Sequence, residues 1–216
     1  AQSLRDEGWI GRDVLAAHWS LCNASDIAFL AEANTSMAHC VASSCRRGFH
    51  RLADMPALFD AGVNVTLGTD NMSEDMFDAL RIGVIINRGL RGDVARPTPQ
   101  EVLTWPTLNA ARALGRDDLG SIEAGKKADL TVVRLDRPHL TPMLSVVPSL
   151  VHYGQASDVE SVMVDGEWIM RDGKVLTMDE PATMQAAQEA SESAWRRLKE
   201  GWPVVDVPDA LRGLIA

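Results

Sequence analysis

Three short apolar runs in the first third of the chain each lead into a side chain that can bind a metal. The runs cover residues 14–17, 35–38 and 61–67, and the side chains at or just beyond their ends are those of His18, His39 and Asp70. The carboxyl ends of parallel strands meet at one edge of a sheet, where α/β barrels carry their catalytic groups. We therefore expect His18 and Asp70 to converge there from neighbouring strands. Two imidazoles and a carboxylate at such an edge indicate a metal-hydrolase site.

Each of these side chains also has a purely structural interpretation. Asp70 could cap the helix expected after it, because aspartate is common at helix N-termini. A histidine at the end of a strand is often a hydrogen-bonded core residue. Cys40 is expected in the core, because neighbouring residues on a strand point to opposite faces and Cys40 cannot readily pair with His39. The shared placement of His18, His39 and Asp70 favours a site over these alternatives.

Up to about residue 118 the sequence alternates strand-like and helix-like segments, a pattern typical of βαβ units around a parallel sheet. The expected helices cover residues 25–33, 52–61 and 75–88. A further helix is expected from Thr98, where a capping box is combined with a proline at the first helical position. Residues 1–118 are therefore predicted to form part of an α/β barrel.

From residue 119 the pattern changes to turns and short strands. The expected strands cover residues 130–135, 159–164 and 167–171. Asp165 and Gly166 form a strong signal for a two-residue hairpin between the last two strands. We predict a β-sandwich module at 119–180, followed at 181–216 by an amphipathic surface helix and a tail.

Composition and charge exclude several functional classes. The chain is 46% hydrophobic, which suffices for a sizeable core, and its net charge of -9 without a Lys/Arg cluster argues against a nucleic-acid partner. No apolar stretch is long enough to cross a membrane and the N-terminal residues are polar, so a cytoplasmic protein is expected. Three cysteines form no disulfide framework and are expected to be reduced. The natural partner is a small neutral or cationic substrate.

Four motifs, in this order, resemble those of the amidohydrolase superfamily. They are Ala17-His18-Trp19, Met37-Ala38-His39-Cys40-Val41-Ala42-Ser43, Leu67-Gly68-Thr69-Asp70 and Leu119-Gly120-Ser121-Ile122-Glu123-Ala124-Gly125-Lys126-Lys127-Ala128-Asp129-Leu130. The most similar branch holds triazine hydrolases, guanine deaminase and adenosylhomocysteine-type deaminases. The resemblance runs from about Leu4 to Asp179 and implies the C-terminal part of a (β/α)8 barrel, strands six to eight, followed by most of a small β-sandwich.

The resemblance also implies an activity and a set of site residues. The expected enzyme is a metal-dependent deaminase or dechlorinase that cleaves a C–N or C–Cl bond of a nitrogen heterocycle with an activated water. Asp70 is expected to bind one divalent metal, zinc first and iron as the alternative, and to shuttle the proton of the attacking water. His18 is expected to polarise the substrate. The implied substrate-binding residues are His18, His39, Ser43 and Asn71.

The sequence departs from the family pattern in two ways. Val41 and Ser44 replace a proline and an asparagine in the motif around His39. The His-x-His and His-x-x-Glu motifs, which supply three of the usual four protein ligands of the metal, have no counterpart in the sequence. We expect a preceding segment or a separate chain to supply them. The alternative is a non-catalytic half-domain that needs such a complement, and open sheet edges favour a homo-oligomer in either case.

Overall fold

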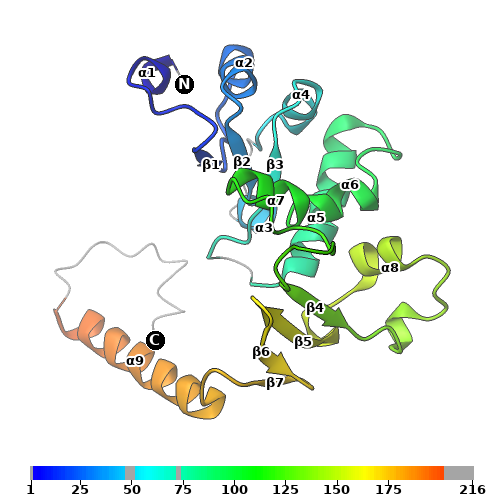
Figure 1. The fold of residues 1–216 in the computed structure, drawn as a ribbon. Helices are drawn as coiled ribbons and strands as arrows, with labels where there is room; N and C mark the ends of the chain where they lie inside the picture. The colour runs from blue at the N-terminus through cyan, green and yellow to red at the C-terminus, as the bar shows by residue number, and fades with distance from the viewer. Residues whose placement is uncertain (1, 47–51, 72–73, 202–216) are drawn as a thin grey trace. The chain divides into compact units, whose positions relative to one another are not determined.

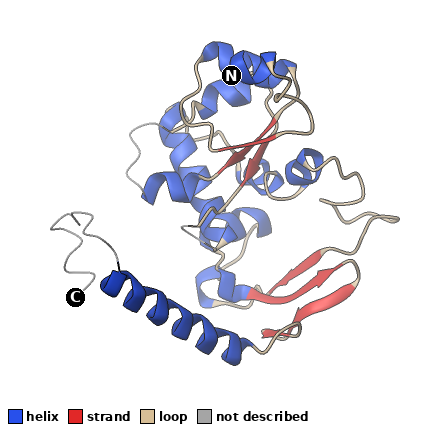
Figure 2. Cartoon of the chain, turned by 90° about the vertical axis from the view of Figure 1, so that its left-hand side faces the viewer, coloured by secondary structure: helices blue, strands red, loops and turns tan. Residues whose placement is uncertain are grey.

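The structure is a computed structural model that describes residues 2–46, 52–71 and 74–201, with side chains described up to residue 197. The chain divides into two compact units, Ala1–Gly173 and Lys174–Ala216. The first unit holds a parallel sheet and three strands of an antiparallel sheet, and the strands are drawn in red in Figure 2. The domain boundaries expected after residues 118 and 180 stay predictions.

The first sheet has three parallel strands, in the order β1 (Leu15–Ala17), β2 (Ser36–His39) and β3 (Val65–Leu67). Helix α2 (Ala24–Glu32) connects β1 to β2, while α3 (Val41–Arg46) and α4 (Met55–Asp60) lie between β2 and β3 in the chain (Figure 1). A short helix, α1 (Gln2–Asp6), precedes β1 and was not predicted. The predicted alternation of strands and helices, and with it the α/β class, is confirmed.

Three helices follow β3: α5 (Met76–Arg91), α6 (Pro99–Thr104) and α7 (Leu108–Ala113). The N-cap of α5 is Asp75, whose carboxylate accepts hydrogen bonds from the backbone N–H groups of Phe77 and Asp78. Gly92, with φ 66°, ends α5 in the left-handed conformation, so the helix runs a turn beyond its predicted end at residue 88. The capping box predicted at the start of α6 is confirmed.

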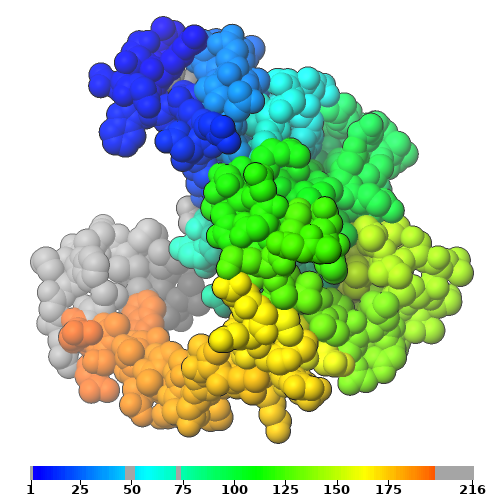
Figure 3. Space-filling model, in the orientation of Figure 1, coloured from blue at the N-terminus to red at the C-terminus, as the bar shows by residue number. Residues whose placement is uncertain are grey.

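The hydrophobic core lies between one face of the parallel sheet and the helices. Met37, Val65 and Leu67 point from β2 and β3 into it and meet fully buried side chains of α2, α4, α5 and α6. Contacts of α4 with α5 and of α7 with β3 make the cyan and green segments one continuous mass in Figure 3. On the opposite face of β1, Leu15 and Ala17 are exposed. This exposure is confined to β1, because Ser36 and Thr66 on the same face of β2 and β3 are buried.

The second sheet is antiparallel, with β5 (Val159–Val164) between β4 (Leu130–Val133) and β6 (Glu167–Arg171). Val164 pairs with Glu167, and the two turn residues Asp165 and Gly166 both have positive φ, as the predicted hairpin requires. Three short helices not predicted from the sequence lie between β4 and β5 in the chain. They are η1 (Pro138–Leu140), α8 (Val146–Tyr153) and η2 (Ala156–Asp158).

The second unit contains β7 (Lys174–Val175) and α9 (Glu180–Gly201), which confirms the helix predicted in this segment. Its described side chains are polar or exposed along most of the helix. Among the described helices, none combines the length and the apolar character needed to span a membrane.

Within the first unit, Arg81 of α5 joins the parallel part to α8. Its guanidinium donates hydrogen bonds to the backbone carbonyls of His152, at 2.7 Å, and Gly154, and to the carboxylate of Asp78 at 2.9 Å. These carbonyls lie at the end of α8, where a helix leaves its last C=O groups without helical partners. One side chain thus satisfies the end of α8 and fixes it against α5.

Arg81→Ala in the complete protein is expected to lower the free energy of unfolding by about 2–4 kcal/mol, because two partly buried carbonyls lose a charged donor. The matched control is Arg116→Ala, which removes an exposed arginine that pairs only two residues away with Asp118. Chemical denaturation of both variants measures the difference. Equal losses of stability would show that the Arg81 contacts do not hold α8 in place.

Candidate functional site

His18 and Asp70 converge at the carboxyl edge of the parallel sheet. His18 follows β1, Asp70 lies three residues beyond β3, and their Nε2 and Oδ2 atoms are 3.5 Å apart. The two side chains keep 37% and 23% of their surface exposed, so the pair remains accessible. The structure thus brings the two residues together as expected, although β2 separates the strands that carry them, which were expected to be neighbours.

The backbone turns sharply at both positions. His18, Trp19 and Asp70 have φ angles of 63°, 45° and 57°, in the left-handed region that side chains other than glycine rarely adopt. The His18 N–H still donates to the carbonyl of Ala38 at 3.0 Å, so the turn begins directly at the end of the β1–β2 ladder. Strained backbone of this kind often marks functional sites, and here it directs both side chains to one point.

Both oxygens of the Asp70 carboxylate accept hydrogen bonds. Oδ2 accepts from the hydroxyl of Ser43 at 2.6 Å, and Oδ1 accepts from the backbone N–H of Asn71 at 2.7 Å. Asp75, not Asp70, caps α5, so the interpretation of Asp70 as a helix cap is wrong. Ser43 is fully buried in α3, whereas Asn71 is exposed beside Asp70. The predicted site residues Ser43, Asn71, His18 and Asp70 therefore form one cluster.

His39 lies apart from this cluster, on the face of the sheet that packs against the helices. Its ring is 2% exposed, meets Trp105 edge to face at a centroid distance of 6.1 Å, and places Nε2 3.3 Å from the side-chain nitrogen of Asn87. Met37, two residues earlier on the same strand, points into the same core. The substrate contact expected of His39 stays a prediction, and its contacts are those of a core histidine.

Cys40 is buried, as predicted, and it also lies close to Asp70 and the backbone of His18. Strand alternation directs it away from the helix side. Its Sγ lies so close to Gly68 that a Cβ at that position would be 2.9 Å away. Burial, the Asp70 carboxylate and an opposing hydrogen bond with the His18 backbone act on this thiol, with a net rise of its pKa. The sequence signal for this placement is the alternation of side chains along a strand, because only one of His39 and Cys40 can face the site.

The remaining three histidines of the chain lie elsewhere or outside the described residues. His139 pairs with the buried carboxylate of Asp158 at 2.8 Å, next to β5. Burial lowers the pKa of His152 in α8, with the charges of Arg88 and Arg81 adding to the effect. His50 falls outside the described residues. None of the described ones adds a ligand beside Asp70.

The described residues do not complete a metal site. Among them, no group of three or more histidine, cysteine, aspartate or glutamate side chains could hold a metal ion. His18 and Asp70 offer one nitrogen and one carboxylate, while catalytic zinc sites use three protein ligands and a water. A metal at this edge therefore needs donors from outside the described part of the chain.

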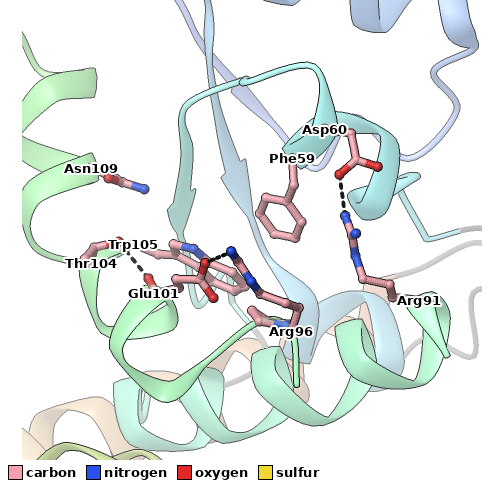
Figure 4. A pocket seen from close by; sticks show the side chains of 9 residues that line it. Phe59, Asp60, Arg91, Arg96, Glu101, Thr104, Trp105 and Asn109 are labelled. Carbon is pink, nitrogen blue, oxygen red and sulfur yellow. Dashed lines mark hydrogen bonds and ion pairs between the residues drawn. The ribbon is translucent and has the colours of Figure 1, made fainter. Parts of the chain in front are cut away.

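A separate cavity of about 470 Å³ lies among α4, α5, α6 and α7 (Figure 4). Its two arginines are each paired with a carboxylate, Arg91 with Asp60 at 2.6 Å and Arg96 with Glu101. Trp105 lines it and separates it from His39. None of the residues predicted for the site lines this cavity, so the candidate site remains the edge with His18 and Asp70.

The fold and the site define an α/β chain with a carboxylate–imidazole pair at the carboxyl edge of parallel strands. The sequence profile of the amidohydrolase family matches residues 4–169, and the chain belongs to this family. The resemblance drawn from the sequence motifs is thereby confirmed.

Named relatives of this chain are deaminases and a chlorohydrolase. The chain is 36% identical over 199 residues to a 5-methylthioadenosine/S-adenosylhomocysteine deaminase of Moorella thermoacetica, covering 90% of this chain and 45% of the relative. The structure is similar to a zinc-bound adenosine deaminase from Xanthomonas campestris, with a TM-score of 0.84, 28% identity and coverage of 89% and 45%. It is also similar to a zinc complex of atrazine chlorohydrolase from Arthrobacter aurescens, with a TM-score of 0.77, 25% identity and coverage of 87% and 43%. The chain thus spans about half the length of the relatives it matches.

The buried imidazole of His39 makes stability depend on pH. Burial, and to a smaller degree an electrostatic interaction with His18, lowers the pKa of His39 to about 4, whereas in the unfolded chain the pKa of this residue is near 6.5. The unfolded state therefore binds more protons between these two pH values. The stability that the neutral imidazole contributes is complete above pH 6.5 and is lost as the pH falls towards 4. For this group the free energy of unfolding is expected to fall by about 2 kcal/mol from pH 7 to pH 5.

Urea denaturation of the complete protein and of His39→Gln at both pH values measures this contribution, since the variant lacks the titrating ring. The unsubstituted protein is expected to lose more stability than the variant over this range. Equal losses would mean that His39 is not held as a buried neutral imidazole.

The close approach of Gly68 and Cys40 predicts a second effect. Gly68→Ala places a methyl group 2.9 Å from Sγ and is expected to displace the segment that carries Asp70. Adding Cys40→Ala removes the sulfur and is expected to restore most of the lost thermal stability. Thermal melts of the single and double variants test this, and failure of the second substitution to restore stability would contradict the proposed contact.

Proposed function

We propose that this chain carries strands six to eight of a (β/α)8 barrel in a hydrolase that acts on a nitrogen heterocycle. The observation that supports this most strongly is the Asp70–His18 pair at the carboxyl edge of the sheet, in a chain of the amidohydrolase family. Deamination of an adenosine-type nucleoside is the first candidate reaction, because the deaminase relative is more similar in sequence than the chlorohydrolase structure. Replacement of a ring chlorine is the second.

In the proposed reaction a ring amino group and water become a ring carbonyl and ammonia. Asp70 accepts a proton from the attacking water and returns it to the leaving nitrogen, a role that an accessible carboxylate can fill. His18, 3.5 Å from the same carboxylate oxygen, orients and polarises the ring atom next to the reacting carbon. The exposed side chain of Asn71 lies beside Asp70 and is proposed to contact the substrate.

Asp70 is also proposed as one ligand of a divalent metal, zinc first. When bound, such an ion lowers the pKa of its water and supplies the nucleophile at neutral pH. The remaining ligands would come from residues outside this chain's described part, in a preceding segment or a complementary chain. The zinc in the two solved structures supports the choice of metal.

A second function, that of a half-domain without activity of its own, is supported by the uncovered face of β1. Leu15 is 45% exposed, and among the described strands neither β1 nor β3 has a partner on its outer edge. Uncovered strands of a parallel sheet require a partner. In this case the chain would associate with its complement, or with further copies, and would bind metal weakly by itself.

Asp70→Asn in the complete protein is expected to reduce turnover of adenosine-type substrates by about 100-fold or more, because the amide keeps the shape but cannot accept the proton. Bound zinc, measured by elemental analysis, is expected to fall as well, while the circular dichroism spectrum stays unchanged.

Asp93→Asn provides the control, because the Asp93 carboxylate lies outside the site and accepts a hydrogen bond from the backbone N–H of Ala95, which an amide oxygen can also accept. It should leave both turnover and zinc content intact. Full turnover in Asp70→Asn would rule out the catalytic role of Asp70.

A further inference from the structure

Ser43 donates one of the hydrogen bonds that hold the Asp70 carboxylate. It is fully buried in α3, the helix that starts two residues after β2 ends, and its hydroxyl donates to Asp70 Oδ2 across 27 residues of sequence. At 2.6 Å this is a short hydrogen bond, of the length expected between a hydroxyl and an ionised carboxylate.

The two oxygens of Asp70 have different partners. Oδ2 lies between the Ser43 hydroxyl and His18 Nε2, while Oδ1 accepts from the Asn71 backbone N–H. Rotation of the carboxylate would break both hydrogen bonds. Ser43 and the Asn71 N–H therefore both favour the orientation in which Oδ2 faces His18.

The same contacts argue against Ser43 as a substrate ligand. A serine hydroxyl has a single proton to donate, and this one is directed to Asp70. No part of the side chain reaches the solvent, whereas 23% of the Asp70 side chain does. A substrate arriving from solvent thus meets Asp70 with Ser43 beneath it.

We propose that Ser43 is a positioning residue that orients the Asp70 carboxylate towards His18, and that it does not contact the substrate. For its effect on catalysis this inference rests on the proposed function. Its structural part, the orientation of Asp70, does not.

The test compares Ser43→Ala with Ser44→Ala in the complete protein. Ser44 is a matched control, since it is the next residue of α3, is also buried, and is turned by about 100° around the helix axis. Crystal structures of both variants are expected to show the Asp70 carboxylate rotated away from His18 in Ser43→Ala and unchanged in Ser44→Ala. An unchanged Asp70 in Ser43→Ala would overturn the inference.

Kinetics with 5′-methylthioadenosine and adenosine separate positioning from substrate contact. Loss of a residue that orients a metal ligand or catalytic group typically costs 10- to 100-fold in activity. We expect kcat of Ser43→Ala to fall by about 10-fold or more with KM within about twofold, and Ser44→Ala to match the unsubstituted protein. A raised KM with unchanged kcat would instead identify Ser43 as a substrate contact and overturn the inference.

Ser43→Thr keeps the hydroxyl and is expected to retain most of kcat, with Ser44→Thr measuring the cost of the added methyl group. This pair of variants also tests the role of the hydroxyl if Ser43→Ala does not fold. A fall in kcat of Ser43→Thr as large as that expected for Ser43→Ala would then contradict this role. If the unsubstituted complete protein hydrolyses none of the heterocycles, the proposed function fails, and the crystallographic comparison still decides the inference about Ser43.

Discussion

The alignment of three parallel strand ends is the constraint on which the candidate site depends. His18 and Asp70 are 52 positions apart in the sequence, and their side chains meet only because β2 holds β1 and β3 in register. The hydrogen bonds from His18 N–H to Ala38 and from Gly68 N–H to His39 extend both ladders to the point where the side chains diverge from the strands. The left-handed residues at these ends then turn the functional groups towards each other.

The residues around this edge divide by face. Met37 and His39 point to the helices, and the buried imidazole contributes to the core. Cys40 and Ser43, from the end of β2 and the start of α3, lie on the side of Asp70, and Ser43 donates a hydrogen bond to it. The site is thus built on two levels, with an accessible carboxylate and imidazole above a buried thiol and hydroxyl.

Much of this arrangement could be predicted from the sequence. Apolar runs ending in His18 and Asp70 predicted strands that deliver these residues to one edge, and the ordered motifs predicted the family. The hairpin at Asp165-Gly166 and the capping box at Thr98 depend only on local chemistry, and both were correctly predicted.

Other features depend on contacts between distant residues and could not be predicted. The short helices between β4 and β5 depend on packing and on Arg81, which lies about 70 residues away from the carbonyls it binds. Likewise, the sequence does not reveal that the hydroxyl of Ser43 reaches Asp70, because that contact requires the turn after β2 to bring α3 next to the segment that follows β3. Strand alternation shows that His39 and Cys40 lie on opposite faces but does not show which of them faces the helices. The packing of Met37 into the core places His39 on the helix side.

The central claim is that Asp70 and His18 form the part of a metal-hydrolase site that this chain contributes. The most direct measurement is a crystal structure of the complete protein with zinc, located by its anomalous scattering. The account predicts the ion about 2.0–2.2 Å from a carboxylate oxygen of Asp70, the usual zinc–oxygen distance, with His18 facing the same cavity. Zinc bound elsewhere in the protein, with Asp70 outside its coordination sphere, would contradict it.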